Sequence, residues 1–281
     1  MKLFVFLLVL LSAFTHALWN LFAKKESGNF PVLWNGLLIG NLVLLPISIS
    51  IVIGSGFPLS AMPFVLGSGI AHALYFFLLI RAYEKTDISI AYPIGRGVGV
   101  GGTTLVAVWL LPEVVSAIGA AGILLICIGV MMIGLVGRKV KSGLRSVGWP
   151  VLVGICTVSY SVLDKVGVVY AHPVVYINLS NIVAATLLSP LMLLRSNHSI
   201  GLVWATKWKM SALIGLGVTG TYLLILFAFR LEQASYIVAV REFSIVVGAL
   251  MGVLFLSESL TLSKILGITA IACGLILVRL A

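Results

Sequence analysis

Charged side chains are scarce in this sequence of 281 residues. Only 9% of the residues are Asp, Glu, Lys or Arg, with eight acidic residues in all, whereas 61% are hydrophobic. A soluble domain carries about 25% charged residues, and a disordered chain contains far more polar sequence than this one. The composition therefore excludes both classes and indicates a chain that buries its apolar surface in a lipid bilayer.

Cysteine is sparse and the common enzyme motifs are missing. The three cysteines, Cys127, Cys156 and Cys273, lie in apolar runs and form no CxxC pair, so we interpret them as small packing residues. No GxxxxGK[ST], HExxH or GxSxG motif occurs, which argues against direct use of ATP, zinc-dependent hydrolysis and a serine nucleophile. We therefore expect neither an enzyme nor a bound cofactor or metal.

Ten apolar runs of membrane-spanning length fill the chain. A bilayer core of ~30 Å needs about 20 residues of helix, and so little sequence lies between the runs that we expect no separate soluble domain. The first run continues past a small-residue segment that resembles a signal cleavage site, and we expect it to be a retained helix. The expected spans are Leu3–Ala23, Pro31–Ile53, Met62–Ala82, Ile88–Leu110, Val114–Val136, Trp149–Tyr170, Pro173–Leu194, Trp208–Phe229, Ala234–Leu256 and Leu260–Leu280.

An internal repeat divides the chain at half its length. Arg96 and Arg241 are 145 residues apart, and Glu113 and Glu258 are separated by the same distance. Because each half contains five spans, an odd number, the second half would enter the membrane inverted relative to the first, an arrangement that places a substrate site near the midplane. The pattern predicts a five-helix repeat over 1–136, a connecting loop over 137–148 and a second five-helix repeat over 149–281.

Several motifs resemble the EamA family of the drug/metabolite transporter superfamily. They are the entry His16-Ala-Leu-Trp-Asn-Leu-Phe-Ala-Lys-Lys25, the layout of five plus five spans, and the Glu that opens the last helix of each half with a Gly nine residues later (Glu113 and Gly122, Glu258 and Gly267). The resemblance covers essentially the whole chain. It implies secondary transport of small metabolites, often export, through a central cavity, with the fifth and tenth helices at the periphery.

Arg96 and Arg241 are the most informative polar residues, because ionisable side chains deep in a membrane usually face a cavity or a partner. Arg96 lies nine residues beyond Asp87, or ~13 Å at 1.5 Å per residue, and Arg241 occupies the matching place in the second half. Guanidinium groups bind carboxylates and phosphates in a two-pronged geometry. The alternative is an internal salt bridge to Glu242, which is also the best candidate for proton coupling.

Seven further side chains are candidates for contact with the substrate. Five of them share a helix face with Arg96 or with one another and two are aromatic candidates for the cavity wall (Trp19 and Tyr160), although packing is an alternative role for each of them. They are Tyr92, Trp19, Tyr160, His16, Asn20, His72 and Tyr75.

Other polar residues favour structural roles. We expect Asn178 and Asn181 to bridge helices, and Asp164 and Lys165, near the end of a span, to reach outward to the membrane surface. Five glycines lie within 95–102. They match GxGxxG by spacing, but no strand–turn–helix unit surrounds them, so we interpret them as sites of close helix packing or as a flexible gate.

The leading interpretation is a secondary transporter of a small organic anion or zwitterion that works by alternating access. The alternatives are a non-transporting membrane scaffold or partner protein and an intramembrane enzyme that acts on lipid. The expected partners are a small-molecule substrate and membrane lipids. Nucleic acid is not expected, because the cations behind the net charge of +10 lie mostly at the ends of apolar runs. A homodimer is left open.

The distribution of cations predicts the orientation. Twelve Lys and Arg residues fall on the side of the odd-numbered connections, and four fall on the side of the termini. By the positive-inside rule, a multi-pass protein of the inner (plasma) membrane would then have both termini outside the cytoplasm.

Overall fold

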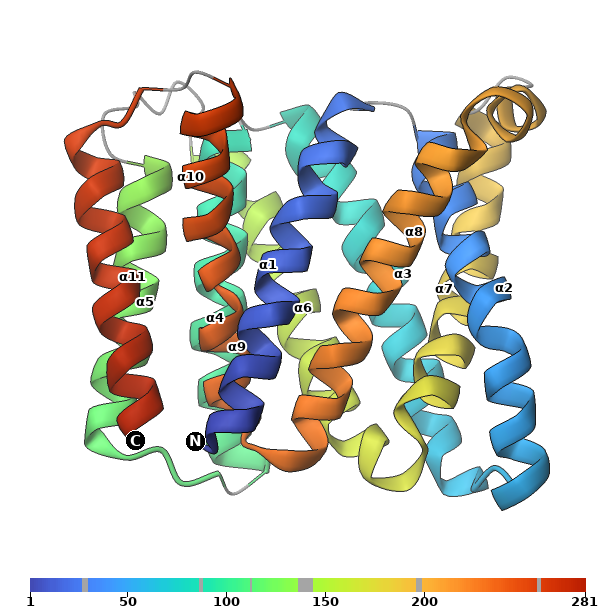
Figure 1. Ribbon diagram of the computed structural model, residues 1–281, viewed down its shortest axis with the longest axis horizontal. Coiled ribbons are helices and arrows are strands. Elements are labelled where there is room, and N and C mark those ends of the chain that lie inside the picture. The colour runs from blue at the N-terminus through green and yellow to red at the C-terminus, as the bar shows by residue number, and fades with distance from the viewer. Residues whose placement is uncertain (27–29, 86–87, 112, 136–143, 196–198, 257–258) are drawn as a thin grey trace.

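The fold is a bundle of helices. The computed structural model describes residues 1–281 except 27–29, 86–87, 112, 136–143, 196–198 and 257–258 (Figure 1). All regular elements of the described residues are helical. They are α1 (Leu3–Lys25), α2 (Phe30–Ser55), the short 3-10 helix η1 (Leu59–Ala61), α3 (Met62–Lys85), α4 (Ile88–Leu110), α5 (Ala117–Leu135), α6 (Leu144–Tyr170), α7 (Pro173–Arg195), α8 (Ser199–Leu231), α9 (Ala234–Arg241), α10 (Phe243–Leu256) and α11 (Leu262–Leu280).

The helices have the length and polarity of membrane spans. Nine segments of the described chain are long and apolar enough to cross a bilayer. α4 has a similar length, 23 residues, but it contains Arg96 and five glycines. Large apolar side chains point outward, as at Trp109 and Leu194, each 82% exposed. Such a surface suits hydrocarbon, where each helix satisfies its own backbone. The chain is a multi-pass, all-α membrane protein, as predicted.

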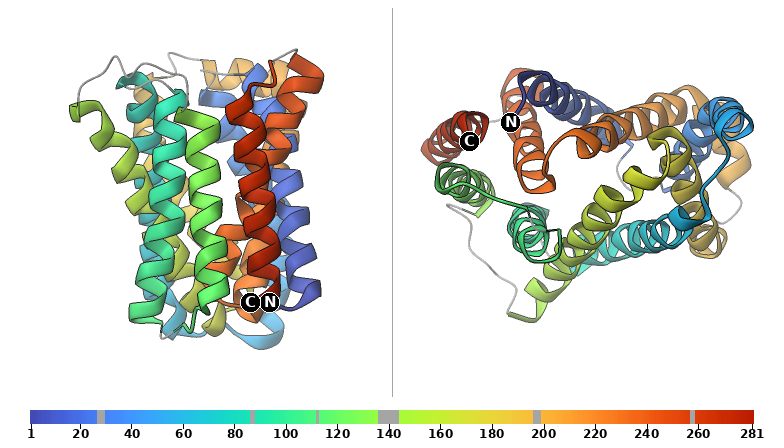
Figure 2. Two further views of the ribbon diagram at one scale, coloured as in Figure 1. Left: turned by 90° about the vertical axis from the view of Figure 1, so that its left-hand side faces the viewer. Right: turned by 90° about the horizontal axis from the view of Figure 1, so that it is seen from below.

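The helices are arranged in two rows (Figure 2). One row contains α2, α8, α1 and α10, and the other contains α7, α3, α6 and α4, with neighbours in each row in direct contact. α5 and α11 pack against each other at one end of the bundle. The last span of each half is therefore peripheral, as the family resemblance implied.

Glycines allow the closest helix contacts. A Cβ atom at Gly122 would lie 2.8 Å from the carbonyl oxygen of Gly274, and one at Gly129 would lie 2.7 Å from that of Gly267. The backbones of α5 and α11 therefore touch directly. On α4, a Cβ atom at Gly99 would lie 2.9 Å from the Thr157 side chain of α6, which confirms close helix packing for this part of the glycine cluster.

The ninth span is not the continuous helix that was predicted. It is divided at Glu242, whose backbone (φ −65°, ψ −11°) forms a turn between α9 and α10. The amide of Glu242 donates to the Ala239 carbonyl, and its own carbonyl accepts from Ile245, both with tight three-residue spacing. No Pro or Gly lies within five residues of the break, which places the Glu242 side chain against α4.

Three helix starts differ from the predicted ones. α5 begins at Ala117 instead of Val114, because the Ser116 hydroxyl accepts from the Gly119 amide and caps the first turn. The predicted loop Arg195–Lys207 contains the first turns of α8, which continue past a kink at Lys207 (φ −125°, ψ 15°). α6 begins at Leu144, so the last five residues of the predicted 137–148 loop are helical.

Met1 and the end of α11 lie at the same end of the bundle (Figure 1). The Arg279 guanidinium of α11 donates to the Met1 carbonyl at 2.8 Å. An even number of crossings, with α9 and α10 as one, explains this placement. Nearby, Glu113 accepts hydrogen bonds from the Ala234 and Ser235 amides at 2.6 and 3.0 Å and thereby caps α9. Glu258 and Asp87 lie outside the described residues.

Candidate substrate site

A buried ion pair joins α4 to the break between α9 and α10. The Arg96 Nε donates to Glu242 Oε2 at 3.0 Å, and Nη2 lies 3.0 Å from Oε1. Only 13% of the arginine side chain and 3% of the glutamate side chain are exposed. This is the internal salt bridge that sequence analysis gave as the alternative role for the arginines, and it involves Arg96. The Arg96 guanidinium also lies 5.8 Å from the Tyr92 ring centroid.

Arg241 is held differently, although it occupies the matching sequence position. It is 8% exposed, and its guanidinium carbon lies 5.3 Å from the centroid of the Tyr222 ring on α8. Within the described part of the chain, no ion-pair partner within 4 Å is found for Arg241, and its Nε has no hydrogen-bond partner. A cation over an aromatic face is stabilised by the ring quadrupole, but no carboxylate of the described residues contacts this guanidinium.

Four aromatic rings gather beside Arg241 from three helices. His72 on α3 stacks on Tyr160 of α6 with centroids 4.2 Å apart, and Tyr222 meets His72 edge-on at 5.3 Å. Tyr160 also meets Tyr75 at 5.8 Å and Tyr222 at 6.0 Å, both edge-on. The structure thus brings three of the predicted residues together with Tyr222. We call His72, Tyr75, Tyr160 and Tyr222 the aromatic cluster.

Asp164 lies next to Tyr222 of the aromatic cluster, and its predicted position was wrong. It was expected to reach the membrane surface, but it is only 1% exposed. Its Oδ1 accepts from the Tyr176 hydroxyl of α7 at 2.9 Å, and its Oδ2 accepts from the Tyr222 hydroxyl. Lys165, one residue later, points elsewhere and donates to the Phe229 and Glu232 carbonyls, each at 2.6 Å.

The predicted residues of α1 lie apart from the aromatic cluster. His16 and Trp19 pack edge to face with centroids 5.0 Å apart, and both arginines are close enough to act on His16 electrostatically. Asn20 is exposed, and its amide donates to the His16 carbonyl of its own helix at 2.9 Å. The structure therefore brings His16 toward the arginines and turns the Asn20 amide back onto α1.

Comparison with known proteins identifies the family. Residues 144–280 match the EamA-like transporter family. The chain belongs to this family. Residues 56–126, in the first half of the chain, match the Small Multidrug Resistance protein family.

The chain is also similar in sequence to a curated relative and in fold to a solved structure. Over 70 residues the chain is 39% identical to an "Uncharacterized transporter in cobO 3'region" of Sinorhizobium sp; the match covers 25% of this chain and half of that relative's length. A solved structure described as "Crystal structure of protein" shares 15% identity and superposes with a TM-score of 0.77 over 100% of this chain and 99% of its own. This likeness shows a common fold.

Sequence reasoning missed Tyr222, Tyr176 and Asp164 in this EamA-like chain. Asp164 follows Tyr160 by four residues, so the two share a helix face, and it is one of two aspartates in the sequence. These signals could have identified Asp164. Nothing in the apolar run around Tyr222 marks that residue. The prediction that Asn178 bridges helices is confirmed, because its amide donates to the Asn41 carbonyl of α2 at 2.8 Å.

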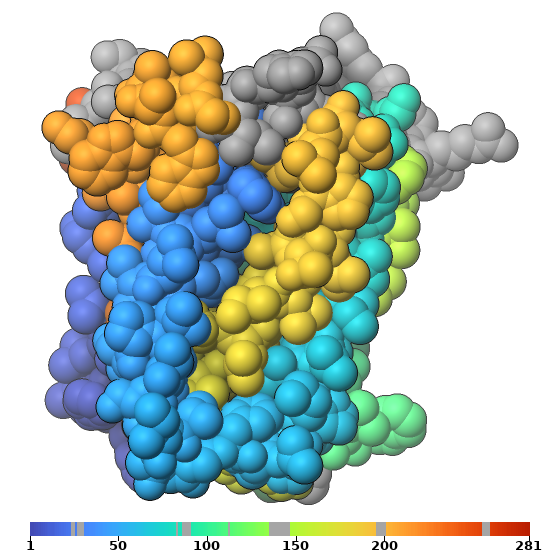
Figure 3. Space-filling model, turned by 90° about the vertical axis from the view of Figure 1, so that its right-hand side faces the viewer, coloured from blue at the N-terminus to red at the C-terminus, as the bar shows by residue number. Residues whose placement is uncertain are grey.

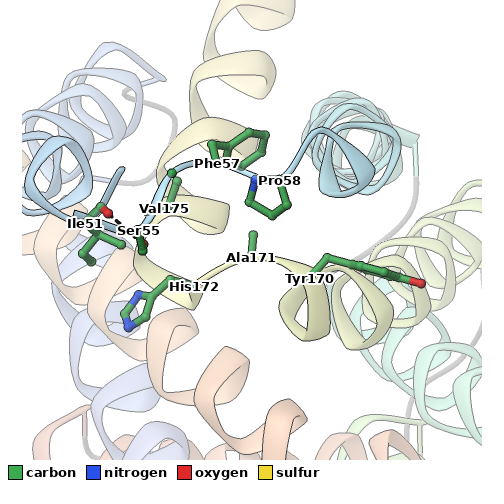
Figure 4. A pocket seen from close by; sticks show the side chains of 9 residues that line it. Ile51, Ser55, Phe57, Pro58, Tyr170, Ala171, His172 and Val175 are labelled. Atoms are coloured by element: carbon green, nitrogen blue, oxygen red, sulfur yellow. Dashed lines mark hydrogen bonds between the residues drawn. The ribbon is translucent and has the colours of Figure 1, made fainter. Parts of the chain in front are cut away.

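Two hollows of the EamA-like bundle lie away from the arginines. A shallow groove of about 200 Å³ separates α2 from α7 on the face shown in Figure 3 and includes Asn41 and Thr186. A cavity of about 410 Å³ lies beside the α6–α7 connection (Figure 4). Burial and the charge of Arg230 lower the pKa of His172, which lines this cavity. Neither hollow contains a predicted site residue.

Proposed function

We propose that the protein is a secondary transporter of a small organic anion or zwitterion, with no catalytic step. The main support for this proposal is that Arg241 is buried and has no ion-pair partner among the described residues. A buried cation without a counter-charge is costly, so a ligand that brings a carboxylate, phosphate or phosphonate would remove that cost. The aromatic cluster offers ring faces and hydroxyl groups for the rest of such a ligand. Membership of a transporter family supports this proposal.

We further propose that residues 1–136 and 149–281 are inverted repeats that rock around this site. The packing supports this relation: when α1–α5 are exchanged with α6–α11, the α1–α8 contact becomes the α6–α3 contact, and α2–α8 becomes α7–α3. The glycine contacts between α5 and α11 behave in the same way. The offset of 145 residues converts the contact of Gly122 with Gly274 into that of Gly267 with Gly129.

The orientation is part of the proposal. The excess of cations on the side of the odd-numbered connections supports an inner-membrane protein with both termini outside the cytoplasm. A reporter that is active only in the cytoplasm, fused after Ala281, should then stay silent. Strong reporter activity would show that the termini lie in the cytoplasm, and it would not affect the substrate proposal.

The alternative, a scaffold without transport, is favoured by one observation. Arg96 forms an ion pair with Glu242, so one of the two arginines is held by the protein itself. A scaffold would use Arg241 in the same way, as a packing residue. The two functions are therefore distinguished by whether a ligand binds at Arg241.

Transport by purified protein in liposomes tests the proposal. Vesicles loaded with an unlabelled carboxylate, amino acid or phosphonate would be assayed for exchange with the same labelled compound outside. We expect exchange of at least one anion or zwitterion, and single cysteines placed beside Arg96 and Arg241 to become reactive from either side in proportions that this compound shifts. Preference for cationic drugs would contradict the substrate class. Absence of exchange together with one-sided labelling would favour the scaffold.

A further inference from the structure

Asp164 changes the balance of charge inside the bundle. Besides Arg96, Arg241 and Glu242, it is a fourth buried ionisable group connected to the site. When both carboxyl groups are ionised, two negative charges balance the two guanidinium groups. When Asp164 holds a proton, one positive charge remains uncompensated. The demand of the site for an anion therefore depends on the state of Asp164.

Tyr222 connects Asp164 to Arg241 directly. Its hydroxyl donates to Asp164 Oδ2, while the Arg241 guanidinium lies over its ring. An ionised carboxylate can accept from Tyr176 and Tyr222 together, one on each oxygen. A protonated carboxyl carries a donor on one oxygen, so one of these two hydrogen bonds must change. Any rearrangement at Tyr222 is transmitted to the ring that supports Arg241.

Hydroxyl groups and the His72 imidazole surround Asp164, and no Lys or Arg of the described residues forms an ion pair with it. α7 contributes Tyr176 and α8 contributes Tyr222. α3 contributes Ser68, whose hydroxyl lies 3.2 Å from His72 Nδ1, and both residues interact with Asp164. The other titratable groups on α6 and on the helices packed against it include Tyr75 on α3, Tyr92 and Arg96 on α4, Arg241 on α9, and Tyr160 and Lys165 on α6 itself. The Lys165 ammonium is engaged with carbonyls at the end of α8.

We propose that Asp164 is a proton-binding site linked to the anion site at Arg241, so that an anion and a proton bind together. The inference rests on the proposed function and names its coupling ion. A proton from water forms one O–H bond on the Asp164 carboxylate, and the incoming anion offsets the positive charge that this leaves. Because the low-dielectric interior penalises the net charge of either single-ligand state, each ligand raises the affinity for the other by the same factor.

Calorimetric titration with benzoate tests the linkage in the purified full-length protein. Benzoate presents a carboxylate and a ring, and experiments would stay in the pH range where it is ionised. Titrations in buffers of different ionisation enthalpy give the number of protons taken up per benzoate bound. We expect about one proton, with affinity rising about tenfold per unit fall in pH while Asp164 is ionised in the empty protein. Asp164→Asn should abolish proton uptake and make the affinity independent of pH.

Two tyrosine variants allow the linkage to be tested even if Asp164→Asn does not fold. Tyr222→Phe and Tyr176→Phe each remove one hydroxyl donor from the same carboxylate. Only Tyr222 also contacts Arg241, so proton uptake should fall in Tyr222→Phe and persist in Tyr176→Phe. Glu84→Gln, which alters a carboxylate paired with Arg81 toward the end of α3, serves as the control for an unrelated acid.

The possible outcomes separate the two proposals. Benzoate binding without proton uptake, or equal loss of uptake in Tyr222→Phe and Tyr176→Phe, overturns the linkage and leaves the transporter proposal intact. Failure of both the wild type and Asp164→Asn to bind benzoate at any pH contradicts the anion site itself, and the linkage falls with it.

Discussion

Arg96 and Arg241 occupy equivalent positions in the two halves of the sequence, yet their surroundings differ. Arg96 has a carboxylate within hydrogen-bond distance and a tyrosine ring beside it. Arg241 has a tyrosine ring but no carboxylate partner within the described chain. The single acid at the α9–α10 break is used by the opposite half of the molecule. A repeat in sequence can therefore produce one structural cation and one available for a ligand.

Removal of Arg96 should have the largest effect, and the effect should be on stability. Arg96→Gln leaves Glu242 buried without its partner, which should lower the free energy of unfolding by about 3–5 kcal/mol. Thermal unfolding in detergent measures the loss. The double variant with Glu242→Gln should recover most of it, whereas Arg81→Gln, in an exposed pair with Glu84, should cost less than about 1 kcal/mol. Equal losses of unfolding free energy in Arg96→Gln and Arg81→Gln would contradict a structural role for Arg96.

Substitution at Arg241 should affect transport and spare the fold. Arg241→Lys breaks no ion pair seen in the structure, so the unfolding temperature should stay close to that of the wild type. Transport of the best anion in liposomes should fall about 100-fold, because lysine cannot form a two-pronged contact. Arg230→Lys, at the exposed end of α8, is the matched control. Normal transport by Arg241→Lys would contradict a role in substrate binding and indicate that Arg241 is a packing residue.

The two tyrosines should give the smallest effects and sharpen the contrast. Tyr92→Leu and Tyr222→Leu each remove a ring from beside one guanidinium, a contact worth about 0.5–2 kcal/mol. Tyr222→Leu should weaken anion binding several-fold, as measured by calorimetry, while Tyr92→Leu should mainly lower the unfolding temperature. The reverse result would show that the ligand site is centred on Arg96.

The sequence was sufficient to predict the architecture because the bilayer imposes it. Runs of about 20 apolar residues can hardly form anything except spanning helices, and the predicted spans correspond to the observed helices. The break at Glu242 was not predicted, because no Pro or Gly lies within five residues of it and the turn depends on the partner across the interface. The helical start of α8, residues 199–207, was missed because a segment of this length is too short to cross a bilayer by itself.

The candidate site was predicted only in part, for a geometric reason. Arg96, Arg241 and Glu242 are identifiable because charges are rare in the spans, but the pairing with Glu242 was only the alternative interpretation, and the sequence did not specify which arginine forms it. Asp164 was misplaced because distance along a helix, six residues from the end of α6, does not specify which neighbour a side chain faces. The substrate roles of these residues, and of Trp19 and His16, stay predictions.

The glycine contacts between α5 and α11 have a mechanical consequence. At Gly122 and Gly129 the backbone of α5 touches the backbone of α11, and the Val278 and Ile271 side chains pack beside these contacts, so the two helices have little room to slide past each other. If the halves rotate relative to each other, the α5–α11 contact would lie near the rotation axis, and the displacement of other residues would increase with distance from it. Arg96 on α4 and Arg241 on α9 are close to this axis and would shift only slightly. The α2–α7 contact lies at the opposite end of the bundle, so its residues would be displaced most. The Asn178–Asn41 hydrogen bond would have to break in such a rotation.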